Sequence, residues 1–210
     1  MLIPFEVLFK KNNIKSKQVL HIGANTGQEA EEYARLGMEK VVWVEAHPQT
    51  YRGLVDHVKA FKGQHHTIHA CVGDVEGEKV TFNVANNGSQ SSSIFNFGTH
   101  SREHPQVKFV SKIEMTMTRL DNLLTEHHID FLDGSFLNID LQGAELKALI
   151  GLGRYLGKFN HVYVEVNEEE LYAGCPLVGE IDSFLHYAGF IGVEKKMTGS
   201  GWGDKYYRRI

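Results

Sequence analysis

Residues 19–27 read VLHIGANTG, a short apolar run that leads directly into a glycine-rich turn. A run of this kind before such a turn is typical of a buried strand that passes into a helix. Apolar residues at helical spacing follow as far as Gly37, and glycine is a common residue at a helix end. Thr26 and Glu29 fit a capping box at the start of this helix. The segment therefore predicts a strand–turn–helix unit of an α/β fold.

Strand and helix patterns continue to alternate after this unit. The next predicted strands cover residues 41–44, 67–72, 136–139 and 162–164. Amphipathic helical patterns follow three of these four strands, which predicts βαβ units and a parallel sheet with helices on both faces. Two last β-like runs, 191–195 and 205–209, predict a hairpin at the end of the sequence.

Residues 79–118 interrupt this alternation. Two β-like runs, 80–84 and 109–117, flank a polar loop rich in Asn, Gly and Ser. We interpret the stretch as a β insertion after the third strand, with a mobile loop. Since we find no long linker and no internal repeat, we expect one domain over residues 1–210, with residues 1–17 as an N-terminal extension.

Composition narrows the class of protein. The 210 residues carry 22 basic and 26 acidic side chains, a net charge of −4, with no block of Lys or Arg, which argues against nucleic-acid partners. No run approaches the ~18 apolar residues of a membrane span. Two cysteines are too few for a disulfide framework, and the start shows no signal-peptide pattern, so we expect a cytoplasmic protein.

The turn at residues 23–27 differs from the dinucleotide-binding fingerprint. That fingerprint has glycine at its first, third and sixth positions, but Asn25 and Gln28 occupy the third and sixth here. Glu45, at the end of the next strand, is placed to accept hydrogen bonds from ribose hydroxyls, and Asp74 could hold an adenine amino group. We therefore expect a nucleoside ligand without a phosphate grip, and S-adenosylmethionine is the commonest cofactor of this kind.

Several segments together resemble the FkbM family of S-adenosylmethionine-dependent methyltransferases. The resemblance covers roughly residues 18–209, and its most specific part is the Asp-x-x-Gly-x-Glu pattern of residues 140–145. The segments that carry it are VLHIGANTG (19–27), VEAHP (44–48), QSSS (90–93), TRLDNL (118–123), LNIDLQGAE (137–145), VEV (164–166), LY (171–172) and GDKY (203–206). The chain departs from the family at His21, where members usually have an acidic residue that helps to hold the methionine part of the cofactor.

The resemblance implies a Rossmann-like class I methyltransferase sheet, mostly parallel, whose last strand is antiparallel. It also implies O-methylation, commonly of sugars in glycans, lipid-linked saccharides or natural products, with S-adenosylhomocysteine as product. The cofactor-binding residues expected on this basis are His21, Gly23, Ala24, Asn25, Gly27, Glu45, Ala46, Val72, Gly73, Asp74, Ser91, Ser92, Ser93, Asp140 and Gln142.

Three acidic residues are the candidates for catalysis. Asp140 is expected to act as a base or to orient the acceptor hydroxyl, with Glu165 as the second candidate and Glu145 divided between the site and loop structure. The same three carboxylates could hold Mg²⁺ or Mn²⁺, which prefer oxygen ligands. Tyr172 is a candidate for contact with the acceptor.

Other functions stay open at this level. The chain could be a non-catalytic S-adenosylmethionine-binding sensor or partner subunit, or a methyltransferase that acts on a protein or a lipid-linked acceptor. The identity of the acceptor and the oligomeric state do not follow from the sequence.

Overall fold

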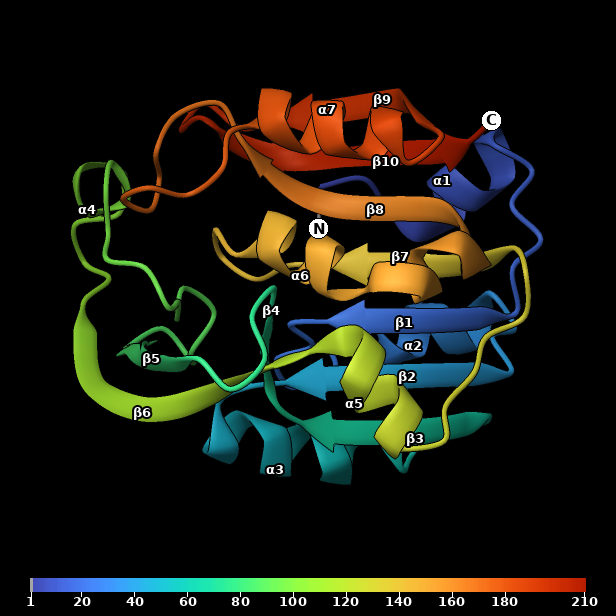
Figure 1. Cartoon of the computed structure of the whole chain (residues 1–210), viewed down its shortest axis with the longest axis horizontal. Helices are drawn as coiled ribbons and strands as arrows, with labels where there is room; N and C mark the ends of the chain where they lie inside the picture. The colour runs from blue at the N-terminus through green and yellow to red at the C-terminus, as the bar shows by residue number, and fades with distance from the viewer. Residues whose placement is uncertain (1) are drawn as a thin grey trace.

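A computed structural model describes residues 2–210 and shows a seven-stranded sheet at the centre of the fold (Figure 1). The strand order is β3-β2-β1-β7-β8-β10-β9. The strands are β1 (Gln18–Ile22), β2 (Lys40–Glu45), β3 (Gln64–His69), β7 (Ser135–Ile139), β8 (Phe159–Asn167), β9 (Phe190–Met197) and β10 (Trp202–Arg209). Strand β10 runs antiparallel to both of its neighbours, whereas β3, β2, β1, β7 and β8 pair in parallel. The expected α/β class, with an antiparallel last strand, is confirmed.

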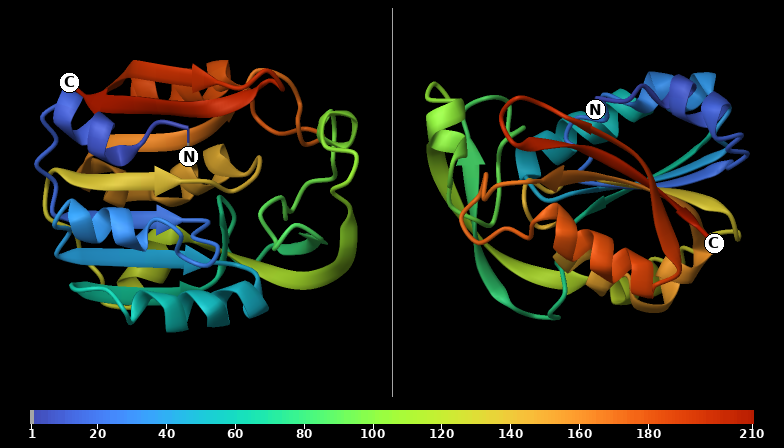
Figure 2. Two further views of the ribbon diagram at one scale, coloured as in Figure 1. Left: turned by 180° about the vertical axis from the view of Figure 1, so that it is seen from behind. Right: turned by 90° about the horizontal axis from the view of Figure 1, so that it is seen from above.

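Helices cover both faces of the sheet, and the seven-stranded sheet separates them in the view from above (Figure 2). Helices α1 (Phe5–Lys11), α2 (Ala30–Arg35) and α3 (Pro48–Val58) share one apolar cluster. Helices α5 (Leu120–Glu126), α6 (Glu145–Gly151) and α7 (Val178–Tyr187), with the 3₁₀ helix η1 (Gly153–Lys158), belong to another. Strand β1 explains this division, because Val19 packs into the first cluster and its neighbour Leu20 into the second.

Two local predictions were wrong. The predicted strand 67–72 is divided, because the chain leaves the main sheet after β3 and continues as β4 (Cys71–Gly73) in another sheet. The capping box is also absent: α2 begins at Ala30, and its N-cap residue is Glu29, which makes no side-chain capping bond. Residues 23–27 form a turn, so they cannot also form the first turn of the helix that the capping box requires.

The predicted β insertion is present as β5 (Lys79–Ala85), α4 (His100–Glu103) and β6 (Phe109–Arg119). Strand β6 pairs with β5 and β4 in a three-stranded sheet beyond the carboxyl ends of β1 and β7 (Figure 1). The mobility of its loop and the division into domains stay predictions. Within residues 2–210, none of the helices combines the length and apolar character that crossing a bilayer requires.

Gly151 determines how closely α6 packs against β4. A Cβ atom at this position would lie 2.1 Å from the carbonyl oxygen of Gly73, a main-chain atom that cannot easily move. We therefore expect Gly151→Ala to lower the free energy of unfolding by about 1–3 kcal/mol in a urea titration, because of overpacking. Gly157→Ala is the matched control, because no atom lies within 4 Å of its added Cβ. Equal stability of the two variants would contradict this packing argument.

Candidate active site

A cavity of about 770 Å³ lies at the carboxyl ends of the central strands. Its floor comes from the ends of β1, β2, β7 and β8, and its opposite wall comes from residues 82–107 of the insertion. This is the edge at which open α/β sheets bind ligands. Residues far apart in the sequence therefore meet in one site.

Gly23 brings the ends of β1 and β7 together. Its φ of +81° is in the left-handed region, and a Cβ atom would lie 1.7 Å from the carbonyl oxygen of Asp140, so only glycine fits. The backbone N–H groups of Gly23 and Ala24 both donate to the carbonyl of Val44, which ties the turn to β2. Ala24 and Gly27 are buried residues of this turn, and Gly27 packs against Leu54 of α3.

Glu45 is held in place by the main chain. One of its carboxylate oxygens accepts the N–H of Asn25 at 2.8 Å, and the other accepts the N–H of His47 at 2.7 Å. Burial raises the pKa of Glu45, while these two N–H groups act in the opposite direction. A carboxylate has about four acceptor positions, so the group can still accept hydrogen bonds from ligand hydroxyls in the cavity.

A small apolar recess adjoins the cavity beside Glu45. Ala46 and Leu141 border both spaces, and Val72, Cys71 and Ile94 line the recess. The recess is only about 30 Å³, too small to enclose a purine, so the fit to the adenosine part of S-adenosylmethionine lies in the chemistry of its rim. The Glu45 carboxylate suits the ribose hydroxyls, and the apolar side chains of Ala46 and Leu141 suit the base. Two residues expected at this end lie outside both spaces: Gly73 packs on Met117, and Asp74 forms an ion pair with Lys147 at 2.9 Å.

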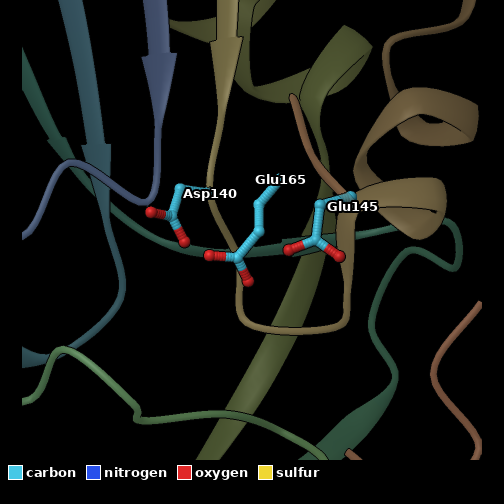
Figure 3. Close-up of side chains that lie close together, drawn as sticks. All are labelled: Asp140, Glu145 and Glu165. Carbon is cyan, nitrogen blue, oxygen red and sulfur yellow. The ribbon is translucent and has the colours of Figure 1, made fainter. Parts of the chain in front are cut away.

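The three acidic candidates Asp140, Glu145 and Glu165 come together at the carboxyl ends of β7 and β8 (Figure 3). Each offers a carboxylate oxygen within 4.8 Å of the others. Gln142 joins two of them: its amide N–H donates to Asp140 at 2.6 Å and to both oxygens of Glu165 at 3.1 and 3.2 Å. The Tyr172 hydroxyl donates to the amide oxygen of Gln142 at 2.5 Å, and the N–H end of the amide faces the acids.

Asp140 and Glu165 line the cavity, but Glu145 and Tyr172 do not. One oxygen of Glu145 accepts the N–H groups of Leu141 and Gly143, which holds the loop after β7, and the other oxygen is buried without a partner. Tyr172 is completely buried behind Gln142. The structure therefore places these two residues as supports of the loop that presents Asp140.

Burial makes all three acids weaker. Desolvation raises the pKa of Asp140 to about 6 and that of Glu145 to about 7. The pKa of Glu165 is raised well above its usual value, by desolvation and by the charges of Asp140 and Glu145. A carboxyl group with a pKa near neutrality can both accept and release a proton, which general acid–base chemistry requires.

The same cluster can be compared with the needs of a divalent cation. Three carboxylates are a suitable oxygen donor set for Mg²⁺. However, the Gln142 amide presents its N–H group, and not its oxygen, to Asp140 and Glu165. A hydrogen-bond donor thus already stands between two of the three carboxylates.

The serine-rich loop lies over the site. Ser91 and Ser92 line the cavity. The hydroxyl of Ser93 donates to the backbone carbonyl oxygen of Gln142 at 2.7 Å. The insertion is therefore linked directly to the loop that carries the acidic cluster. Sequence reasoning missed two further acidic residues of the cavity, Glu29 and Asp204. Asp204 lies in residues 203–206, one of the segments that carry the family resemblance, and this position could have marked it as a candidate.

The strand order, the antiparallel β10 and the cavity at the strand ends define the fold of S-adenosylmethionine-dependent methyltransferases. Solved structures with this fold include an S-adenosylmethionine-dependent methyltransferase from Aquifex aeolicus, with a TM-score of 0.51 and 15% identity over 99% of this chain and 89% of that one. Another is TrmK from M. capricolum in complex with S-adenosylhomocysteine, with a TM-score of 0.51 and 9% identity over 100% of this chain and 70% of that one.

The methyltransferase FkbM domain model matches residues 21–191, and the chain therefore belongs to the FkbM methyltransferase family. By family and by fold it is a methyltransferase of the S-adenosylmethionine-dependent class. A curated relative is the 2-O-methyltransferase NoeI of Sinorhizobium fredii, which is 25% identical over 178 residues, 78% of this chain and 69% of the relative.

The raised pKa of Glu145 has a consequence for stability. Folding shifts this pKa from 4.5 to about 7, so the stabilising contribution of the group is full below pH 4.5 and is lost as the pH rises through 7. Glutamine cannot ionise. We expect the free energy of unfolding of Glu145→Gln, relative to the wild type, to rise by roughly 2–3 kcal/mol between pH 4.5 and pH 8. The exposed Glu126→Gln is the control, and a difference that stays constant with pH would show that Glu145 is ionised throughout.

Proposed function

We propose that this chain transfers the methyl group of S-adenosylmethionine to a hydroxyl of an uncharged saccharide. The observation that carries the proposal is the position of Asp140: it reaches the same cavity as Glu45, and Gln142 holds its carboxylate. The relative NoeI is named as a 2-O-methyltransferase, which supports oxygen as the methyl acceptor. Sugars as acceptors come from the family resemblance of the sequence.

The mechanism assigns one task to each side chain. S-adenosylmethionine supplies an electrophilic methyl group on its sulfonium when it is bound. Asp140 accepts the proton of the acceptor hydroxyl as that oxygen attacks, and its pKa of about 6 suits this task. Gln142 keeps Asp140 and Glu165 at a fixed separation, and Glu165 is the second group able to hold the proton. We assign cofactor contacts to Gly23 and Asn25 of the turn, to Glu45 and to Ala46.

The cavity wall favours an uncharged acceptor. Its insertion side is rich in amides and hydroxyls, with Asn86, Asn87, Gln90, Ser91 and Gln106 among the lining residues. Such uncharged side chains can donate hydrogen bonds to the uncharged hydroxyls of a sugar and accept hydrogen bonds from them.

The charges on the cavity lead to the same conclusion. Among the described residues that line it, five are acidic and none is Lys or Arg. A phosphate would therefore meet acidic side chains and no Lys or Arg, which also argues against nucleic-acid substrates. The cytoplasmic location stays a prediction from the sequence.

Binding of S-adenosylhomocysteine tests the cofactor part of the proposal. Calorimetry should show clear binding to the wild type and at least tenfold weaker binding to Glu45→Ala, because hydrogen bonds to a charged group are lost. Glu39→Ala is the matched control, since Glu39 is exposed and precedes β2 at the opposite edge of the sheet. Folded wild-type protein that does not bind would overturn the proposal.

Transfer of a labelled methyl group tests the acceptor part. Neutral hexose glycosides and N-acetylglucosamine should be methylated, and their 6-phosphates should not. Asp140→Asn should lower the rate at least 100-fold, which is typical of a lost general base. Asp133→Asn, an exposed aspartate, should not change it.

The same assay in EDTA should give an undiminished rate, because the Gln142 amide directs its N–H group into the space between Asp140 and Glu165. A rate lost in EDTA and restored by Mg²⁺ would instead assign the three carboxylates to a metal. Strong S-adenosylhomocysteine binding with no methylated saccharide would favour a non-catalytic binding protein.

A further inference from the structure

The corner of the cavity at the end of β1 has an unusual set of side chains. His21 stands at the position where an acidic residue is expected from the family resemblance, and it is 2% exposed. Its ring lies against Trp43, with 5.3 Å between ring centroids, and its Nδ1 atom is 3.3 Å from the hydroxyl of Tyr33. Desolvation lowers the pKa of His21 to about 3, so the imidazole is neutral near pH 7. A neutral imidazole cannot replace the charge of a carboxylate.

A carboxylate nevertheless reaches this corner from elsewhere. Glu29, the residue before α2, lines the same cavity as His21. A carboxylate oxygen of Glu29 lies 3.9 Å from Nδ1 of His21, too far for a hydrogen bond, and the Glu29 side chain is 19% exposed. Among residues 2–210, no Lys or Arg forms an ion pair with Glu29.

The usual structural role for an acidic residue at a helix start does not account for this side chain. Glu29 makes no side-chain capping bond to α2. Glu31 and Glu32, which follow it, already supply negative charge in the first helical turn. The Glu29 side chain is thus mostly enclosed and lines the cavity, and within residues 2–210 no Lys or Arg neutralises its carboxylate.

A second acidic residue adds to the negative charge of this corner. Asp204 of β10 lines the cavity and accepts the hydroxyl of Tyr163 at 2.6 Å and the N–H of Leu2. Its charge is close enough to contribute to the raised pKa of Glu29. Both donors bind the same oxygen, Oδ2, so Asp204 is anchored by Tyr163 and Leu2 and adds its negative charge beside Glu29.

The strand order sets the direction in which a ligand would lie. Glu45 ends β2 and Asp204 lies on β10, and the ends of β1, β7 and β8 lie between these two strands. A ligand whose ribose meets Glu45 and which extends along the floor therefore reaches the corner of His21, Glu29 and Asp204 with its other end. In S-adenosylmethionine that end carries an ammonium group.

We infer that Glu29 binds the α-ammonium group of the methionine part of the cofactor and supplies the carboxylate that position 21 lacks. The inference rests on the proposed function, since it concerns the same cofactor site. It explains why a histidine is tolerated at the end of β1, because Glu29, the residue before α2, supplies the acidic group instead. Glu29 is then a cofactor-binding residue, and His21 packs beneath it.

Three ligands separate this contact from all others in calorimetry. The first is S-adenosylhomocysteine, the second is its analogue without the α-amino group, and the third is 5′-methylthioadenosine, which lacks the whole amino-acid part. Glu29→Gln should bind S-adenosylhomocysteine about tenfold more weakly than the wild type does. It should bind the other two ligands within about twofold of the wild type. Unchanged binding of 5′-methylthioadenosine also shows that the variant is folded.

Glu31→Gln is the matched control, because Glu31 is an exposed residue in the first turn of α2, two positions after Glu29, and pairs with Arg35. Two results would overturn the inference: an unchanged affinity of Glu29→Gln for S-adenosylhomocysteine, or an equal loss of affinity for all three ligands. Failure of the proposed function looks different, because wild-type protein would then bind none of the three.

Discussion

The close approach of two main-chain segments, at Gly23 and at Asp140, sets the geometry of the whole site. The carbonyl of Asp140 occupies the space that a side chain at position 23 would need. The N–H groups of Gly23 and Ala24 then bind the carbonyl of Val44, so the ends of β1, β2 and β7 are tied to one another. Glu45 and Asp140 therefore project from a rigid edge and not from independent loops, and rigid elements position functional groups more accurately.

The second constraint is the cost of burying acidic groups. Removing a carboxylate from water is unfavourable unless donors replace its hydration. The chain supplies these donors from nearby: two N–H groups for Glu45, two for Glu145, and the amide of Gln142 for Asp140 and Glu165. Gln142 has a φ of +53°, a left-handed conformation that is uncommon for a residue with a side chain. These donors lower the pKa values of the acids, but desolvation, which raises them, is the larger effect, so the acids stay weak.

Much of the fold could be predicted because it depends on local patterns. The strand 19–22, its glycine turn and the acidic residues at the strand ends are visible in the sequence, and parallel strands bring such ends to one edge. Contacts between distant segments were not predictable. Nothing in the sequence shows that Tyr172 orients Gln142, or that the chain leaves the main sheet after His69.

Glu29 is a clear case of a local rule that misleads. Its spacing from Thr26 suggested a capping box, and the turn conformation directs it to the cavity instead.

The division of the cavity between floor and wall also has a consequence for how this enzyme can diverge. The floor is built from strand ends that the core fixes, whereas most of the wall comes from one continuous stretch of the insertion. Replacement of that stretch would exchange the surface offered to the acceptor and leave the edge of the sheet intact. Natural variation in acceptor preference is therefore expected to accumulate in residues 86–106. The bond from Ser93 to Gln142 is the point where such drift would disturb the chemistry.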